Sequence, residues 1–245
     1  MATYPPGLHH SAMWDQFKNV CGDLIRSGNH KDICEIGAGR DPLFTLEEIE
    51  ELGVNYTVVD VDAGELELLP EGFHALVADL CEPGVIGVGN QFDFILSRTA
   101  AEHMRDGEMM HRNVLALLRP GGEAIHMFPT LYHPIFAVNR ILPGWVSDVL
   151  LNRYDPRAKP KFKAYYSMCR GPSRRVLRRL TALGFIVAEH RPFYGHDYFK
   201  NIGVLRQIDD GFSAWAARRR NPYFTTYAWL RVRKPAAHEG PIQTH

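Results

Sequence analysis

Short apolar runs alternate with amphipathic segments between residues 30 and 128, and this alternation predicts strands that follow one another through helices. Apolar residues at helical spacing predict one helix before the first strand, over residues 12–26, and three between later strands, over 43–52, 63–69 and 109–118. This order favours a parallel, doubly wound α/β sheet. The runs interpreted as strands cover residues 33–36, 56–60, 75–79, 92–97 and 123–128.

The alternation stops after residue 128. Residues 129–170 are rich in proline and aromatic residues and are too long for a plain connection, so they predict a helical insertion. We expect a lid over a ligand-binding site, although its aromatic residues could instead pack on the sheet or form a dimer contact. A helix over 174–183, a strand over 185–191, a helix within 202–219 and a strand over 225–233 follow.

The pattern divides the chain into four parts. Residues 1–29 form an N-terminal helical cap, and residues 30–128 together with 171–235 form the core. We predict that residues 129–170 form the lid insertion and that residues 236–245 form a disordered tail.

The first predicted strand ends in Glu35-Ile36-Gly37-Ala38-Gly39, which is typical of a turn beside a bound nucleotide. Gly37 can adopt a positive φ, and Gly39 has no side chain to keep a ligand off the backbone. Amides at the start of the next helix can then face an electron-rich group. Asp41 stands where the dinucleotide fingerprint has its third glycine, so the turn alone does not identify the ligand.

Acidic residues end the first three predicted strands: Glu35, Asp60 and Asp79. Ligands of open α/β sheets lie outside the carboxyl ends of the strands. Asp60, 21 residues after Gly39, stands where a carboxylate would hold a ribose diol. Asp79 could accept from the exocyclic amine of adenine, and Glu35 could steady a cationic amino-acid group. Any one of them could simply cap a helix, but the set with the glycine turn favours a nucleoside site.

These motifs and their order resemble class I S-adenosylmethionine-dependent methyltransferases of the small-molecule, type 11-like group. The resemblance covers about residues 30–128 and includes Ala101-Glu102-His103, which is similar to the family's Leu-Glu-His, and the Pro120-Gly121-Gly122 turn. It implies a Rossmann-like, seven-stranded sheet with an antiparallel last strand, and S-adenosyl-L-methionine as cofactor. The expected cofactor contacts are Glu35, Gly37, Ala38, Gly39, Asp60, Val61, Asp79, Leu80 and Ser97.

Residues just after Ser97 should face the transferred methyl group, because their strand neighbours the first strand in this topology. His103 is the candidate catalytic base, since histidine titrates near neutral pH. Alternatively, Glu102 and His103 cap the following helix or brace the loop. No pair of the chain's candidate histidines has close helical ligand spacing, so we predict no metal. The expected acceptor contacts are Arg98, Glu102, Tyr132, His133, Asn139, Tyr166, Tyr194 and His196.

Composition narrows the possible partners. Lys and Arg total 28, as do Asp and Glu, so a zero formal charge provides no general attraction to nucleic acid or an anionic membrane. Four scattered cysteines suggest neither a disulfide framework nor a zinc site and fit a reducing, cytoplasmic setting. We find no apolar run of the roughly 18 residues that a membrane span needs, and no signal peptide in residues 1–17.

The leading hypothesis is methyl transfer from S-adenosyl-L-methionine to a small-molecule acceptor. We favour O-methylation of a partly apolar metabolite or natural-product intermediate by a cytoplasmic enzyme that could form a homodimer. The alternatives are an RNA methyltransferase, an NAD-dependent oxidoreductase and a non-catalytic S-adenosylmethionine-binding protein. The incomplete glycine fingerprint disfavours the oxidoreductase.

Overall fold

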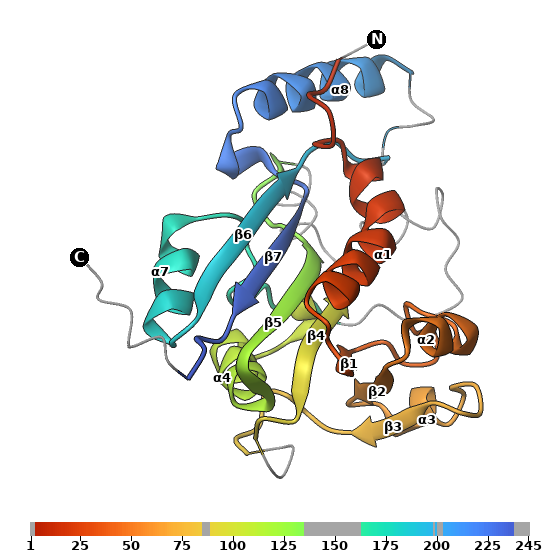
Figure 1. The fold of residues 1–245 in the computed structure, drawn as a ribbon. Helices are drawn as coiled ribbons and strands as arrows, with labels where there is room; N and C mark the ends of the chain where they lie inside the picture. The colour runs from red at the N-terminus through yellow and green to blue at the C-terminus, as the bar shows by residue number, and fades with distance from the viewer. Residues whose placement is uncertain (1–2, 85–88, 135–162, 198, 200–202, 238–245) are drawn as a thin grey trace.

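A computed structural model describes residues 3–84, 89–134, 163–197, 199 and 203–237 (Figure 1). In these residues a seven-stranded sheet has the order β3-β2-β1-β4-β5-β7-β6. The strands are β1 Asp32–Ile36, β2 Asn55–Asp60, β3 His74–Val77, β4 Phe92–Arg98, β5 Leu118–Pro129, β6 Ile186–Phe193 and β7 Tyr227–Arg233. The α-helices are α1 His10–Ser27, α2 Leu46–Leu52, α3 Ala63–Leu66, α4 Gly107–Leu117, α7 Arg174–Ala182 and α8 Gly203–Arg218, and the 3-10 helices are η1 Ala101–His103 and η2 Pro222–Phe224.

The strand pairing confirms the Rossmann-like α/β sheet predicted from the sequence. β1 pairs in parallel with β2 on one side and with β4 on the other, and β3 and β5 extend the parallel part. β7 lies antiparallel between β5 and β6. The strand order therefore reverses direction beside β1, which is where open α/β sheets bind their ligands.

Two hydrophobic cores cover the two faces of the sheet, because successive side chains of a strand point to opposite faces. On one face, Phe94 of β4 packs in a cluster with Phe17 of α1 and Trp229 of β7. On the other face, Ile95 packs in a cluster with Val114 of α4 and others. Each fully buried aliphatic or aromatic side chain contributes about 1.5–3 kcal/mol to folding. Helices therefore pack on both faces of the sheet (Figure 1).

Several predicted helix boundaries shift because capping side chains decide where the helices begin. α2 starts after Thr45, which forms a capping box with Glu48, and ends at Gly53 with a φ of +62°. α4 starts after Asp106, whose carboxylate accepts from the N–H groups of Glu108 and Met109. The first helix begins earlier than predicted, at His10, and α3 is shorter than predicted.

The sequence places the Pro120-Gly121-Gly122 turn between the predicted helix over 109–118 and the predicted strand over 123–128, and this boundary is wrong. β5 begins at Leu118 and runs through the turn, with a register shift opposite Phe92 and Phe94. Arg119 donates to the carboxylates of Asp32 and Asp93 at 2.7 and 2.9 Å, which ties the starts of β1 and β4 together. β3 is also displaced, since it ends at Val77 and leaves Asp79 in the following loop.

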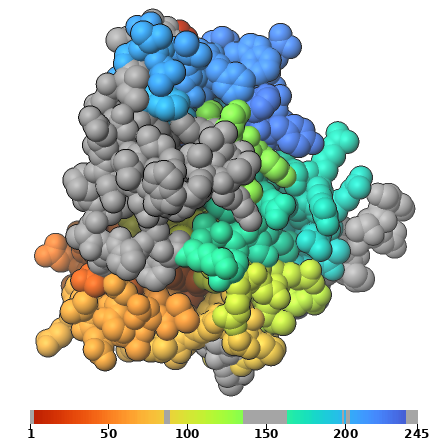
Figure 2. Space-filling model, turned by 180° about the vertical axis from the view of Figure 1, so that it is seen from behind, coloured from red at the N-terminus to blue at the C-terminus, as the bar shows by residue number. Residues whose placement is uncertain are grey.

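Most of the predicted lid lies outside the described residues, as does the end of the predicted tail. The chain is described again from Lys163, and its return segment docks on η1 and the start of α4. The N–H groups of Tyr165 and Tyr166 both donate to the carbonyl of Glu102, and Gly107 N donates to Ser167 Oγ at 2.9 Å. In the space-filling view, residues after 162 (teal) lie against α4 (yellow-green) (Figure 2). In the described part of the chain, no helix combines the length and apolar character needed to cross a bilayer.

Candidate functional site

A cavity of about 510 Å³ opens at the carboxyl ends of β1, β2, β3 and β4. This volume lies in the range of sites that hold metabolites and cofactors. The wall includes most of the predicted cofactor contacts: Gly37, Ala38, Gly39, Asp60, Val61, Asp79 and Leu80. His103, the candidate base, also lines the cavity.

The glycine turn needs its glycines for two separate reasons. Gly37 has a φ of +73°, and an added Cβ would stand only 2.4 Å from the Cβ of Ala100. Gly39 has a φ of +53°, and its Cβ would contact Glu65 and Asp60 across the cavity wall. Each of the two glycines therefore has a left-handed backbone conformation, and at each one the position of an added Cβ is already close to neighbouring atoms.

Glu35 and Arg98, which were predicted to contact the cofactor and the acceptor, hold the loop that follows this turn. Glu35 is fully buried and accepts from Leu43 N at 2.8 Å and from the Tyr56 hydroxyl at 2.7 Å. Burial raises the pKa of Glu35, although these hydrogen bonds and the charge of Arg98 oppose the shift. Arg98 donates to the carbonyl of Asp41 at 2.7 Å. Neither Glu35 nor Arg98 belongs to the cavity wall, so both act on the site through the loop.

Asp60 is fixed by the backbone at both of its oxygens. Oδ2 accepts from Gly39 N and Oδ1 from Asp62 N, each at 2.9 Å. A carboxylate oxygen has two lone pairs, so each oxygen can accept a second hydrogen bond from a ligand. The carboxylate is therefore oriented in the cavity wall in advance of ligand binding.

An arginine that the sequence did not single out lies at the Asp79 end of the cavity. Arg105 donates to the carboxylates of Asp79 and Glu82, and Asp79 also accepts from Cys81 N at 2.8 Å. Burial alone would raise the pKa of Asp79, but the Cys81 hydrogen bond and Arg105 outweigh it and leave the pKa below its ordinary value. The spacing of Arg105 follows no motif, so only the fold identifies it.

Two other cavity residues also lacked a sequence signal. Glu65 forms a bidentate pair with Arg40, in which Nε and a terminal nitrogen donate at 2.6 and 2.8 Å, beside Gly39. Thr99 has a φ of +53°, which is strained for a β-branched residue, and its N–H donates to Met127 O. Strained residues of this kind cluster at functional sites, and Thr99 lines the cavity where β4 ends.

The 3-10 helix η1 presents His103 to the cavity and buries Glu102 beneath it. Nδ1 of His103 lies 3.1 Å from the carbonyl oxygen of Lys163. Because a carbonyl only accepts, Nδ1 carries the proton of neutral His103 and Nε2 carries the lone pair. Glu102, predicted to contact the acceptor, is 4% exposed and outside the cavity wall, and Oε1 lies 3.8 Å from His103 Nε2.

Burial raises the pKa of Glu102 to about 8. The folded state therefore keeps a proton that the unfolded state releases above its ordinary pKa of 4.5. Stability from this group is complete below pH 4.5 and is lost as the pH rises towards 8, with a limiting slope of about 1.4 kcal/mol per pH unit. We expect Glu102→Gln to flatten this decline in the unfolding free energy, measured by denaturant titration from pH 5 to 8.5. Glu71→Gln, at an exposed position, serves as the control, and equal slopes for wild type and E102Q would contradict the assignment.

The remaining predicted residues lie away from this cavity. Ser97 is buried, and its Oγ forms a hydrogen bond with Nδ1 of His126 at 2.8 Å, so it lies in the core and not in the cavity wall. Tyr194 is fully buried, and its hydroxyl donates to Asn221 O at 3.1 Å. Tyr132 contacts the Tyr223 ring, and Tyr166 packs against the core. Asn139 lies outside the described residues.

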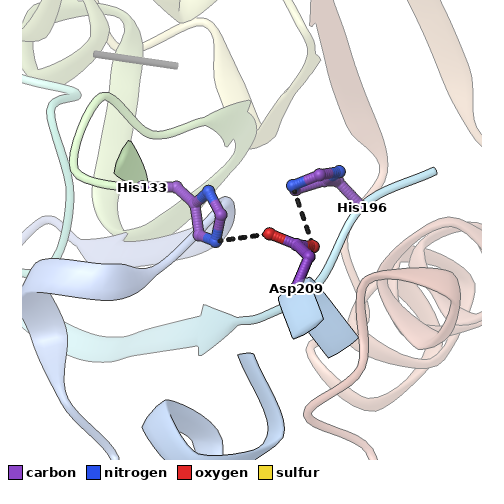
Figure 3. Close-up of side chains that lie close together, drawn as sticks. All are labelled: His133, His196 and Asp209. Atoms are coloured by element: carbon purple, nitrogen blue, oxygen red, sulfur yellow. Dashed lines mark ion pairs between the residues drawn. The ribbon is translucent and has the colours of Figure 1, made fainter. Parts of the chain in front are cut away.

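His133 and His196, predicted as acceptor contacts, come together with Asp209 of α8 (Figure 3). Both histidines are buried, and their rings meet edge to face at 4.9 Å between centroids. Burial, together with the neighbouring His196, lowers the pKa of His133 to about 4. Nothing in the sequence linked Asp209 to these histidines.

A model of a protein family described as "Methyltransferase domain" matches residues 13–203 of the chain. No curated protein sequence matches the chain.

Solved structures with the same fold have varied activities. A putative sarcosine dimethylglycine methyltransferase from Galdieria sulphuraria is 12% identical, with a TM-score of 0.55 and coverage of 96% of this chain and 92% of that one. A phosphoethanolamine N-methyltransferase from Haemonchus contortus, solved with S-adenosylhomocysteine, is 16% identical, with a TM-score of 0.57 and coverage of 91% and 53%. The [4+2]-cyclase SpnF is 14% identical, with a TM-score of 0.56 and coverage of 91% and 81%. At such low sequence identities, the similarity shows a shared fold and does not identify the activity of this chain.

Proposed function

The chain belongs to the methyltransferase domain family, as a class I S-adenosylmethionine-dependent enzyme, and from this premise we propose O-methylation of a small, partly apolar acceptor. The observation that carries the proposal is His103, which lines the cavity at the end of β4 with its lone pair on Nε2. A hydroxyl acceptor must lose its proton as it attacks the methyl group, and a histidine is suited to remove that proton.

The cavity wall supports the expected position of the cofactor. When bound, S-adenosylmethionine supplies a methyl group that its sulfonium sulfur already activates. We propose that Gly37 and Gly39 line its methionine part, that Asp60 accepts hydrogen bonds from the ribose hydroxyls, and that Asp79 and Leu80 frame the adenine. The left-handed glycines and the oriented Asp60 carboxylate fit this placement. The protein then mainly aligns the acceptor oxygen with the bond between sulfur and methyl.

Tyr165 supports an acceptor that is partly apolar. Tyr165 lines the cavity with His103, and the Lys163 ammonium lies 4.9 Å from the centroid of its ring. An aromatic wall with a few polar groups is typical of sites for small organic molecules. A screen of phenols, hydroxy acids, amines and RNA with methyl-labelled cofactor tests the acceptor class. Transfer only to RNA, or tight cofactor binding with no transfer to any acceptor, would contradict the proposal.

The remaining predictions from the sequence concern location and assembly. All four cysteines are free and buried, which supports a reducing compartment such as the cytoplasm. A homodimer remains a prediction.

We expect His103→Asn to lower the single-turnover rate of methyl transfer by about 10²- to 10⁴-fold, the usual contribution of a general base, with little change in cofactor affinity. Asparagine keeps an N–H donor near the Lys163 carbonyl but has no basic nitrogen. The measurement is single-turnover methyl transfer, with cofactor affinity determined by calorimetry. If His103→Asn keeps wild-type turnover and His103→Ala does not, the histidine braces the loop and is not the base.

A further inference from the structure

Two buried histidines and a carboxylate meet outside the cofactor cavity, from parts of the chain that are far apart in sequence. His133 follows β5, His196 follows β6, and Asp209 lies in α8. One ligand atom from each side chain lies within 4.8 Å of the others. Figure 3 shows both imidazoles turned towards the same carboxylate.

The topology explains why these residues meet. β5 and β6 both run antiparallel to β7 and therefore parallel to each other, so both end at the same edge of the sheet. The segments after them carry His133 and His196, and α8 lies near the end of β6 (Figure 1). The cluster is therefore built by three elements of the described fold.

The two carboxylate oxygens of Asp209 each face a different histidine. Oδ2 lies 3.1 Å from Nε2 of His196, and Oδ1 lies 4.0 Å from Nε2 of His133. The side chains of His133 and His196 are 2% and 1% exposed, and that of Asp209 is 14% exposed. Ser213 Oγ lies 3.4 Å from the same nitrogen of His133.

Two imidazoles and one carboxylate are a donor set suited to divalent transition metals. Bonds of roughly 2.0–2.2 Å to zinc place ligand atoms of one ion about 3–4 Å apart, and the three ligand atoms here lie within 4.8 Å of one another. Phe199 and Phe212 pack against His196 and His133, with ring centroids 5.6 and 6.0 Å away. An apolar surround of this kind limits the access of solvent to a metal.

We propose that His133, His196 and Asp209 bind one divalent transition-metal ion. Three protein ligands leave a coordination position for water or another small oxygen ligand. The expectation of no metal rested on the lack of close ligand spacing along one helix. That argument does not apply to a cluster assembled from three separate elements. The competing interpretation is a metal-free cluster of ion pairs and hydrogen bonds around Asp209.

Metal titration of the full chain, produced without a histidine tag and stripped with chelator, tests the proposal. Calorimetry with Zn²⁺ should show one equivalent bound per chain, and Co²⁺ should give visible ligand-field absorption. Zn²⁺ should also raise the midpoint of thermal unfolding, because it binds only the folded site. These readouts need no acceptor and no S-adenosylmethionine.

Asp209→Asn keeps the shape of the side chain and removes its charge, so it should fold as the wild type does. We expect it to weaken Zn²⁺ binding by more than roughly 10- to 100-fold, which is the usual cost of removing a residue that only hydrogen-bonds to a metal ligand. His196→Ala should do the same, and His74→Ala, at an exposed position on β3, should bind as the wild type does. Absence of stoichiometric binding to the wild type, or equal binding by wild type and Asp209→Asn, would overturn the proposal.

Discussion

The Gly37→Ala variant is expected to lose about 2–5 kcal/mol of unfolding free energy and at least 10-fold in affinity for S-adenosylhomocysteine. The left-handed backbone, with a φ of +73°, costs an alanine about 1–2 kcal/mol. The new Cβ would also stand 2.4 Å from the Cβ of Ala100, and such overpacking costs about 1–3 kcal/mol more. Because Gly37 is in the cavity wall, relief of this overlap displaces the turn that binds the cofactor.

Gly84→Ala is the matched control for Gly37→Ala. Gly84 has a φ of +68°, but nothing lies within 4 Å of the position of its Cβ. It therefore carries the backbone cost without the overlap, and we expect unchanged cofactor affinity. Denaturant titration and calorimetry on both variants separate the two costs.

A double-mutant cycle identifies the atom responsible. Ala100→Gly removes the methyl group that the new Cβ would meet, so the double variant Gly37→Ala with Ala100→Gly should lose less stability than the sum of the single variants. Strict additivity would show that Ala100 does not limit the turn.

Asp60→Ala is expected to weaken S-adenosylhomocysteine binding by roughly 10- to 150-fold. A charge-assisted hydrogen bond contributes about 1.5–3 kcal/mol, and each 1.4 kcal/mol is tenfold in affinity. Calorimetry measures the loss, with Glu71→Ala as an exposed control of the same charge change.

Asp60 also accepts hydrogen bonds from the N–H groups of Gly39 and Asp62. A modified ligand is therefore needed to distinguish a direct contact with the ribose from an effect on the loop. The 2′-deoxy analogue of S-adenosylhomocysteine lacks one ribose hydroxyl. The wild type should bind it more weakly than the parent compound, whereas Asp60→Ala should bind the two alike. If the variant still discriminates between them, Asp60 acts only through the loop.

Most of the residues that the sequence assigns to the cofactor line one cavity in the structure, because the sequence signals that identify them are local. Glycine positions, strand ends and the spacing from Gly39 to Asp60 follow directly from the geometry of one βαβ unit. The family match then confirmed the fold class and the methyltransferase assignment. Glu35 is an exception: it lies at the end of β1, as the sequence predicts, but it is not part of the cavity wall. Its side chain points into the core, where it binds Leu43 N and Tyr56.

Long-range pairing explains what the sequence could not predict. Arg105 reaches Asp79, and Asp209 reaches two histidines, only after strands and helices distant in the chain have packed. The β5 boundary failed for a related reason, because Arg119 joins Asp32 and Asp93 and the strand continues through Pro120 and Gly121. Local turn chemistry predicted a break there, and tertiary contacts produced a strand.

The most direct test of the cofactor site is a crystal structure of the full chain with S-adenosylhomocysteine. The proposed placement of the cofactor predicts that the ribose hydroxyls lie within roughly 2.6–3.2 Å of the Asp60 carboxylate, the adenine between Asp79 and Leu80, and the sulfur towards His103. Binding outside the cavity at the ends of β1–β4, or a ribose out of reach of Asp60, would contradict it.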